Sequence, residues 1–114
     1  MKIIETNIPQ AELNSKTVHM MTMSSDIVKM KDRVGECFKV ECYVLYEDVN
    51  SKGETQRILS VKDGDCVAAT NSPTFIEDFF RIRDLWDMCG EPMGEIIVKA
   101  GRSKNGREFI TCEV

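Results

Sequence analysis

The fold of this chain is decided by the stretch Ser72-Pro-Thr-Phe-Ile-Glu-Asp-Phe-Phe-Arg-Ile-Arg-Asp-Leu-Trp86. Ser72 is placed to cap a helix, and Pro73 suits the first helical position. Large apolar side chains then recur at the spacing of one helix face. They are Phe75, Phe79, Ile82 and Trp86. Since the following Cys89-Gly-Glu-Pro92 is typical of a helix end, the sequence predicts one amphipathic helix over about 72–89, packed on a sheet.

The residues before this helix predict a meander of three strands. Between Glu36 and Val49, apolar and aromatic side chains alternate with polar ones, as in a half-buried strand. The other strands and turns are expected in this order: a turn at Asn50–Gly53, a strand at Gln56–Lys62, a tight turn at Asp63-Gly64 and a strand at Asp65–Thr70.

The N-terminal third has a less regular pattern. We expect residues 1–15 to form a flexible arm or an edge strand, and Thr17–Met23 to form a strand. The apolar spacing within Asp26–Val34 predicts a short helix or turn that ends at Gly35.

The last residues, Ile96–Val114, predict a basic hairpin. Two apolar runs flank Asn105-Gly106, a dipeptide that readily supplies two residues with positive φ to a tight turn. Lys99, Arg102, Lys104 and Arg107 surround the turn, although the chain as a whole is acidic, with 15 Lys and Arg against 19 Asp and Glu. A local basic strip on an acidic protein indicates an anion site, for which a phosphate backbone is the obvious candidate. The alternative is an ordinary solvated hairpin tip.

Taken in order, these elements predict a mainly β, single-domain fold over residues 1–114 with one helix. About five strands and one helix before the last strand pair fit an OB-fold-like β-barrel, in which the helix caps the barrel and one sheet face binds oligonucleotides. Other small barrels with one helix would show the same pattern.

Composition limits the class of protein. The chain has 114 residues, a net charge of −4 and 42% hydrophobic residues, which is ordinary for one globular domain. The start is too short and polar for a signal peptide, and no apolar run is long enough to span a membrane. The five cysteines are irregularly spaced without a C-x-x-C motif, so we expect buried, reduced thiols rather than disulfides or zinc ligands.

We find no catalytic set in the sequence. The one histidine, His19, lies in an apolar segment and has no evident partner, and no phosphate-loop, dinucleotide or zinc-protease motif occurs. We therefore expect a protein that is not an enzyme and that uses no metal and no cofactor.

A nucleic-acid site needs cations for phosphates and accessible aromatic rings for bases. The alternation favours Phe38, Val40, Cys42 and Val44 as core residues. Tyr43 is then the more accessible ring, while Tyr46 near the strand end can face either way. The predicted nucleic-acid-binding residues are Lys39, Tyr43, Tyr46, Arg57, Lys62, Lys99, Arg102, Ser103, Lys104, Arg107 and Phe109. The alternative is that the rings are core residues and the cations ordinary surface charges.

Two stretches carry a resemblance to a known family. They are Lys62-Asp-Gly-Asp-Cys-Val-Ala-Ala-Thr-Asn-Ser-Pro-Thr-Phe-Ile-Glu-Asp-Phe-Phe and Val98-Lys-Ala-Gly-Arg-Ser-Lys-Asn-Gly-Arg-Glu-Phe-Ile. In order and short motifs, residues 35–114 resemble the small single-stranded DNA-binding proteins of bacteriophages and prophages of Gram-positive bacteria, such as those of protein-primed phages. The resemblance implies an OB fold and sequence-independent coating of single strands in phage DNA replication or recombination, in the cytoplasm of the infected bacterium.

Two other functions compete with single-stranded DNA binding. A small acidic phage protein could instead bind and inhibit a basic host nuclease or defence effector, through Asp84, Asp87, Glu91 and Glu95. The third hypothesis is a structural or regulatory β-barrel without a nucleic-acid role. For self-association we favour a dimer or a higher assembly, because exposed edge strands of small β-proteins often pair with another chain.

Overall fold

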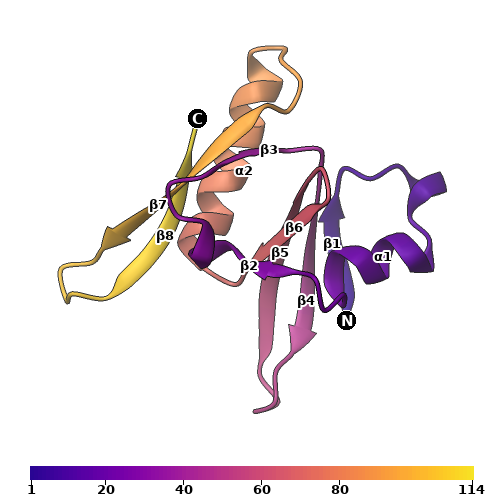
Figure 1. Cartoon of the computed structure of the whole chain (residues 1–114), viewed down its shortest axis with the longest axis horizontal. Helices are drawn as coiled ribbons and strands as arrows, with labels where there is room; N and C mark the ends of the chain where they lie inside the picture. Colours follow the sequence, from indigo (N-terminus) through magenta and orange to yellow (C-terminus); the bar gives the residue numbers. More distant parts are fainter.

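The computed structural model describes all residues, 1–114, as two β-sheets with two α-helices and two 3₁₀ turns (Figure 1). The elements, in chain order, are β1 (Lys2–Thr6), η1 (Gln10–Glu12), α1 (Ser15–Thr22), β2 (Val28–Lys29), η2 (Met30–Arg33), β3 (Cys37–Lys39), β4 (Cys42–Val49), β5 (Thr55–Asp63), β6 (Cys66–Thr70), α2 (Pro73–Met88), β7 (Glu95–Arg102) and β8 (Glu108–Glu113). Neither helix is long and apolar enough to cross a membrane.

The prediction of a mainly β fold is confirmed, but the prediction of a closed five-stranded barrel with one helix is wrong. One sheet has five strands in the order β1-β4-β5-β6-β2, and the other has three in the order β3-β7-β8. The predicted strand Glu36–Val49 is interrupted at Val40-Glu41. As a result, β3 pairs with β7 whereas β4 pairs with β5. A stretch with one continuous alternating pattern therefore contributes strands to two separate open sheets.

The second helix, α1, occupies the segment that we expected to be a strand at Thr17–Met23. The side chain of Asn14 caps it, because its Oδ1 accepts a hydrogen bond from the amide of Thr17 at 3.0 Å. Met21 on its inner face is fully buried against the five-stranded sheet. The mixture of threonine, valine and methionine suggested a strand, and the decisive signal was the capping asparagine.

The other N-terminal predictions are met in part. Residues Lys2–Thr6 form an edge strand, β1, which is one of the two expected alternatives. Asp26–Val34 contains the short strand β2 and the 3₁₀ turn η2, and Gly35 follows with a φ of 91°. Met30 in this segment is fully buried and packs in the main core.

The five-stranded sheet is covered on both faces, which explains why the exposure expected for Tyr43 is wrong. Tyr43 and Leu45 of β4 belong to the main core with α2, whereas Val44 and Tyr46 belong to a second core with α1. A strand that is buried on both faces has no accessible side, so the alternation of polar and apolar residues could not identify one.

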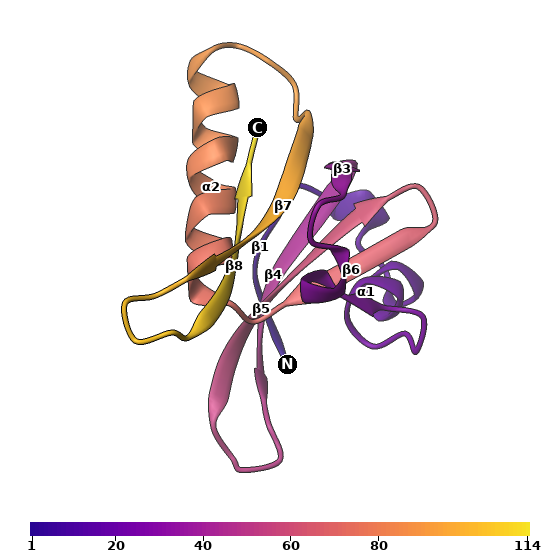
Figure 2. The ribbon, with the colours of Figure 1, turned by 60° about the vertical axis from the view of Figure 1, so that its left-hand side comes forward.

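Helix α2 begins and ends close to the predicted positions. The hydroxyl of Ser72 accepts a hydrogen bond from the amide of Phe75, and Gly90, with a φ of 68°, follows the helix end. Its apolar stripe is buried as expected. The helix lies along β8 (Figure 2), where the Ser72 hydroxyl also donates to the carbonyl of Ile110 at 3.4 Å. Ile110 and Cys112 of β8 share the main core with Phe75 and Phe79 of α2, so the helix covers one face of the three-stranded sheet.

A cluster around Arg83 joins β1, β4 and α2. Tyr43 meets Phe79 and Phe80 edge to face, with ring centroids 5.3 and 5.6 Å away. The Arg83 guanidinium lies 4.7 Å from the centroid of Phe80, donates to the Tyr43 hydroxyl at 3.1 Å and pairs with Glu5 of β1. Partial burial lowers the pKa of Arg83, but its hydrogen bonds with Tyr43, Asp84 and Glu5 outweigh this effect and raise the pKa above its usual range.

The Arg83 cluster predicts different costs for two arginines on one helix. Arg83→Ala should lower the free energy of unfolding by about 1–3 kcal/mol, since it removes a cation–π contact and partly buried charge-assisted hydrogen bonds. Arg81→Ala should change it by about 0.5 kcal/mol or less, because the Arg81–Glu77 pair is exposed. Urea denaturation followed by circular dichroism measures both, and equal losses would contradict this role for Arg83.

The prediction that the thiols are buried holds for only one cysteine. All five cysteines are free, but Cys37 and Cys89 are exposed, Cys42 and Cys66 are half-buried, and Cys112 alone is buried. Burial raises the pKa of the Cys112 thiol to about 12.

We expect the thiols to react in the order of their exposure. With iodoacetamide at pH 8, Cys37 and Cys89 should be alkylated first, while Cys112 stays unmodified until the protein unfolds, because the thiolate is the reactive form. Peptide mass spectrometry measures the order, and the protein in denaturant is the control. Native-state labelling of Cys112 as fast as Cys89 would be incompatible with its buried position.

Candidate nucleic-acid interface

The β7–β8 hairpin is present, but its turn differs from the expected one. The last ladder pair is Arg102 with Glu108, and the turn runs from Ser103 to Arg107. The amide of Gly106 donates to the carbonyl of Ser103, and the amide of Ser103 donates to the carbonyl of Arg107, both at 2.9 Å. Gly106 has a φ of 75°, whereas Asn105 does not adopt a positive φ. One glycine therefore closes a longer turn, with the tip side chains exposed.

Two of the four cations in the predicted basic strip form ion pairs within the protein. Lys99 pairs with Glu113 at 3.1 Å and Arg102 with Glu108 at 3.2 Å. On the β4–β5 hairpin, Arg57 pairs with Glu47 at 3.5 Å. Lys104 and Arg107 are the hairpin cations that have no ion-pair partner in the structure, so the positive charge is concentrated at the tip.

Lys62 is also committed to an internal contact. Its ammonium lies 2.7 Å from the Glu41 carboxylate, which also accepts a hydrogen bond from the amide of Gly64 at 2.9 Å. The hydrogen bond from Lys62 and the one from Gly64 together lower the pKa of Glu41. Lys39 is exposed in β3, where its amide donates to the Asp63 carboxylate. Lys39 and Lys62 thus lie around the β5–β6 turn, apart from the hairpin tip.

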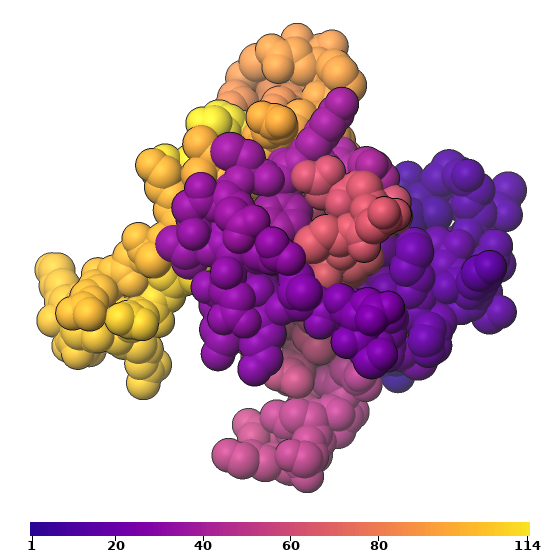
Figure 3. Space-filling model, viewed as in Figure 1, coloured from indigo at the N-terminus to yellow at the C-terminus, as the bar shows by residue number.

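A groove lies between the β7–β8 hairpin and the five-stranded sheet, beside the start of α2. Its volume is about 1130 Å³. Apolar side chains contribute to its lining, including Ile58, Ala69 and Ile110, and polar uncharged side chains such as Gln56, Asn71 and Thr74 line it as well. Figure 3 shows the β7–β8 and β4–β5 hairpins projecting from the body, with the segment that contains η2 between them.

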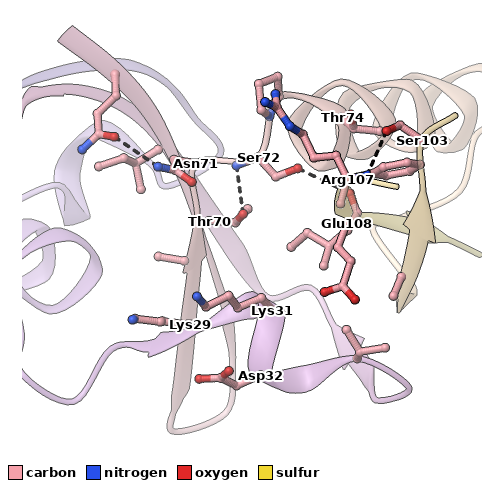
Figure 4. Close-up of a pocket in the computed structure, with 18 residues that line it drawn as sticks. Lys29, Lys31, Asp32, Thr70, Asn71, Ser72, Thr74, Ser103, Arg107 and Glu108 are labelled. Carbon is pink, nitrogen blue, oxygen red and sulfur yellow. Dashed lines mark hydrogen bonds between the residues drawn. The ribbon is translucent and has the colours of Figure 1, made fainter. Parts of the chain in front are cut away.

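Cations line this groove from two separate segments of the chain. Lys29 and Lys31 come from β2 and η2, whereas Arg107 comes from the hairpin turn (Figure 4). None of the three forms an ion pair in the structure, and all three are exposed. Because Met30 between the two lysines is fully buried, the lysines on either side of it are held at the surface. Two carboxylates, Asp32 and Glu108, also line the groove.

Sequence reasoning missed Lys29 and Lys31. The signal was the basic run Lys29-Met-Lys-Asp-Arg33, which we treated only as a question of helix or turn. Of the predicted site residues, the structure brings Ser103, Arg107 and Phe109 to the groove. The others do not line it: Lys39, Tyr43, Tyr46, Arg57, Lys62, Lys99, Arg102 and Lys104.

The predicted stacking platforms are reduced to one ring. Tyr43 is 3% exposed and Tyr46 is 4% exposed, so neither offers a ring face to a base in this structure. Burial raises the pKa of Tyr46, and its hydroxyl donates to the carbonyl of Thr22 at 3.4 Å. Phe109 is half-buried on β8 opposite Gly101, and it remains the one candidate for stacking among the predicted aromatic residues.

The comparisons with known proteins do not assign the chain to a family. No protein-family model matches the chain, and no match was found among curated proteins or solved structures. The structure contains no group of three or more His, Cys, Asp or Glu side chains that could hold a metal ion. The candidate site is therefore defined by its own geometry and charge.

Gly101 positions the ring of Phe109, which gives a direct test. A Cβ at residue 101 would lie 2.8 Å from the Cε2 and Cζ atoms of the ring, so Gly101→Ala should displace it. In a double-mutant cycle with Phe109→Ala, we expect a coupling free energy of about 1 kcal/mol, because alanine at 101 is free of the clash once the ring is gone. Urea unfolding of the four proteins measures it, and additive effects would contradict the contact.

Proposed function

We propose that this protein binds single-stranded DNA, without sequence specificity, in the groove between the β7–β8 hairpin and the five-stranded sheet. The observation that carries the proposal is the convergence of Lys29, Lys31 and Arg107, all without ion-pair partners, on one hollow of an otherwise acidic protein. Cations on two walls of a groove can follow the phosphates of a strand that runs between them.

Charge distribution supports a localised site rather than a general affinity for polyanions. The net charge is −4, and the cations of Arg57, Lys62, Lys99 and Arg102 are already occupied by carboxylates. A phosphate backbone is therefore repelled by most of the surface and attracted at the groove and the hairpin tip, where Lys104 adds a fourth free cation. A flexible single strand can enter a recessed groove, whereas a rigid duplex would meet chiefly the projecting hairpin tips.

The sequence resemblance supports the same function and suggests its setting. The hairpin Val98–Ile110, which resembles that of phage single-stranded DNA-binding proteins, supplies one wall of the groove, and the start of α2 lies beside it. We infer a role in phage DNA replication or recombination within the bacterial cytoplasm, with the DNA strand as partner and without a catalytic step, metal or cofactor.

The binding should be mainly electrostatic, because Phe109 is the one aromatic side chain at the groove. Neutralising phosphates releases counterions from the nucleic acid, so affinity falls with salt. With Lys29, Lys31, Lys104 and Arg107 engaged, the slope of log K against log salt should be about −3 for a single strand. A purely stacking interaction would show little such dependence.

The test is fluorescence anisotropy with a labelled oligo-dT 30-mer at several salt concentrations and with duplex DNA as competitor. We expect salt-sensitive binding that duplex does not displace, and its loss in the triple variant Lys29→Glu, Lys31→Glu and Arg107→Glu. The matched control is Lys16→Glu, Lys52→Glu and Arg81→Glu, which changes the net charge equally at exposed positions outside the groove.

Two results would count against the groove. Equal loss of binding in the control variant would show that net charge, and not the groove, sets the affinity. Absence of binding by the unmodified protein at low salt would remove the proposed function altogether. Circular dichroism of both triple variants shows whether the fold is retained.

A second candidate function has one specific observation in its favour. Between the end of α2 and the start of β7, Asp87, Glu91 and Glu95 make no ion pair, and Met88, the last residue of α2, is 77% exposed. An apolar side chain amid free carboxylates suits a basic protein partner, such as a host nuclease or defence effector. Asp84, which we grouped with these acids, is instead paired with Arg83 at 2.9 Å. Stoichiometric capture of a basic host protein, lost in Asp87→Lys with Glu91→Lys, would favour this function.

A further inference from the structure

The outer edge of β1 is an unoccupied strand edge at one end of the five-stranded sheet. β1 is bonded to β4 on one side and to no strand on the other. Lys2, Ile4 and Glu5 are exposed along it, with Ile4 37% accessible. Unpaired backbone amides and carbonyls in such an edge are a template for another strand.

An irregularity in β1 decides which side chains share a face. Ile3 is opposite Tyr46 and Glu5 is opposite Leu45, so the register shifts by one residue at Ile4. Lys2 is opposite Glu47. Since Leu45 and Glu47 lie on one face of β4, Lys2 and Glu5 also lie on one face, although their spacing in a regular strand would place them on opposite faces.

This arrangement makes the edge complementary to itself. In an antiparallel pair of β1 strands with Lys2 opposite Glu5 of the second copy, Ile3 is opposite Ile4 of that copy. A two-fold axis perpendicular to the sheet relates the two copies, so equivalent side chains lie on the same face of the joined sheet. Lys2 and Glu5 can face each other in this symmetry because the register shift at Ile4 places both on one face. The axis creates two Lys2–Glu5 pairs, one from each copy.

In the single chain, Lys2 is free and Glu5 has one carboxylate oxygen that Arg83 does not contact. Lys2 makes no ion pair, and its neighbour Glu47 is engaged by Arg57. Arg83 contacts Oε1 of Glu5, which leaves Oε2 for a second cation. Opposite charges directly across two strands stabilise the pairing, and like charges destabilise it.

We propose that two copies of this chain associate through β1, in the antiparallel register that pairs Lys2 with Glu5, to form one continuous sheet across the dimer. The strand has five residues, so the interface is small and the dimer is weak and concentration-dependent. β2, which carries Lys29 of the groove, is the opposite edge of the same sheet. The dimer therefore leaves both grooves open at its two far ends, and the inference does not depend on what the grooves bind.

The experiment is sedimentation equilibrium on the full chain, from micromolar to about millimolar concentration, with Lys2→Glu as the main variant. We expect a monomer–dimer equilibrium whose dissociation constant rises by about 10-fold or more in Lys2→Glu, because two attractive pairs become repulsive. Lys16→Glu is the matched control, since it makes the same charge change on α1, and it should leave the constant unchanged.

A second variant and a cross-link keep the test independent of folding effects at Lys2. Ile4→Lys places a charge at the exposed register shift and should also weaken the dimer, while thermal unfolding by circular dichroism reports whether the fold persists. In a mixture of ¹⁴N- and ¹⁵N-labelled protein, a carbodiimide should join Lys2 of one copy to Glu5 of the other, as seen by mass spectrometry. A monomer at every concentration, or a dimer that neither variant weakens and that lacks this cross-link, overturns the proposal.

Discussion

The packing of Tyr43 against the aromatic face of α2 is the contact on which the rest of this structure depends. Tyr43 lies on β4, at the point where the five-stranded sheet, α2 and, through Arg83 and Glu5, the edge strand β1 come together. The same helix covers β8. Because α2 touches both open sheets, its burial determines how they are placed relative to each other, and neither sheet needs to close on itself to protect its core.

This arrangement has a direct consequence for the candidate site. The chain has few aromatic residues, and the core uses most of them, including Tyr43 and Tyr46. The groove is correspondingly poor in rings and depends on cations held at its rim. Its lysines are positioned by the buried Met30 between them, and its arginine by the hairpin turn. The site is therefore anchored to the core through Met30, and its three cations are exposed.

The two projecting hairpins share one design. In both, the side chain of the first turn residue accepts a hydrogen bond from the amide four residues later. Asn50 accepts from Glu54, and Ser103 accepts from Arg107. Each turn also contains one glycine with positive φ, at Gly53 and Gly106. Such turns keep the strands in register up to the tip, so the tip lysines Lys52 and Lys104 are carried well clear of the core.

The elements whose signals are local could be predicted from the sequence. The cap at Ser72, the proline after it and the apolar stripe sufficed for α2, and glycine-containing turns sufficed for the two long hairpins, because these features depend on neighbouring residues. Features that depend on residues far apart in the chain appeared only in the tertiary structure. They are the separation of β3 and β4 into two sheets at Val40-Glu41 and the burial of both faces of β4. The placement of Lys29 and Lys31 across a groove from Arg107 is a third. Periodicity reports whether polar and apolar residues alternate along a strand, but the burial of each face depends on what packs against it. An ion pair such as Arg102 with Glu108 or Lys99 with Glu113 likewise depends on strand register, so only the folded chain shows which cations remain free.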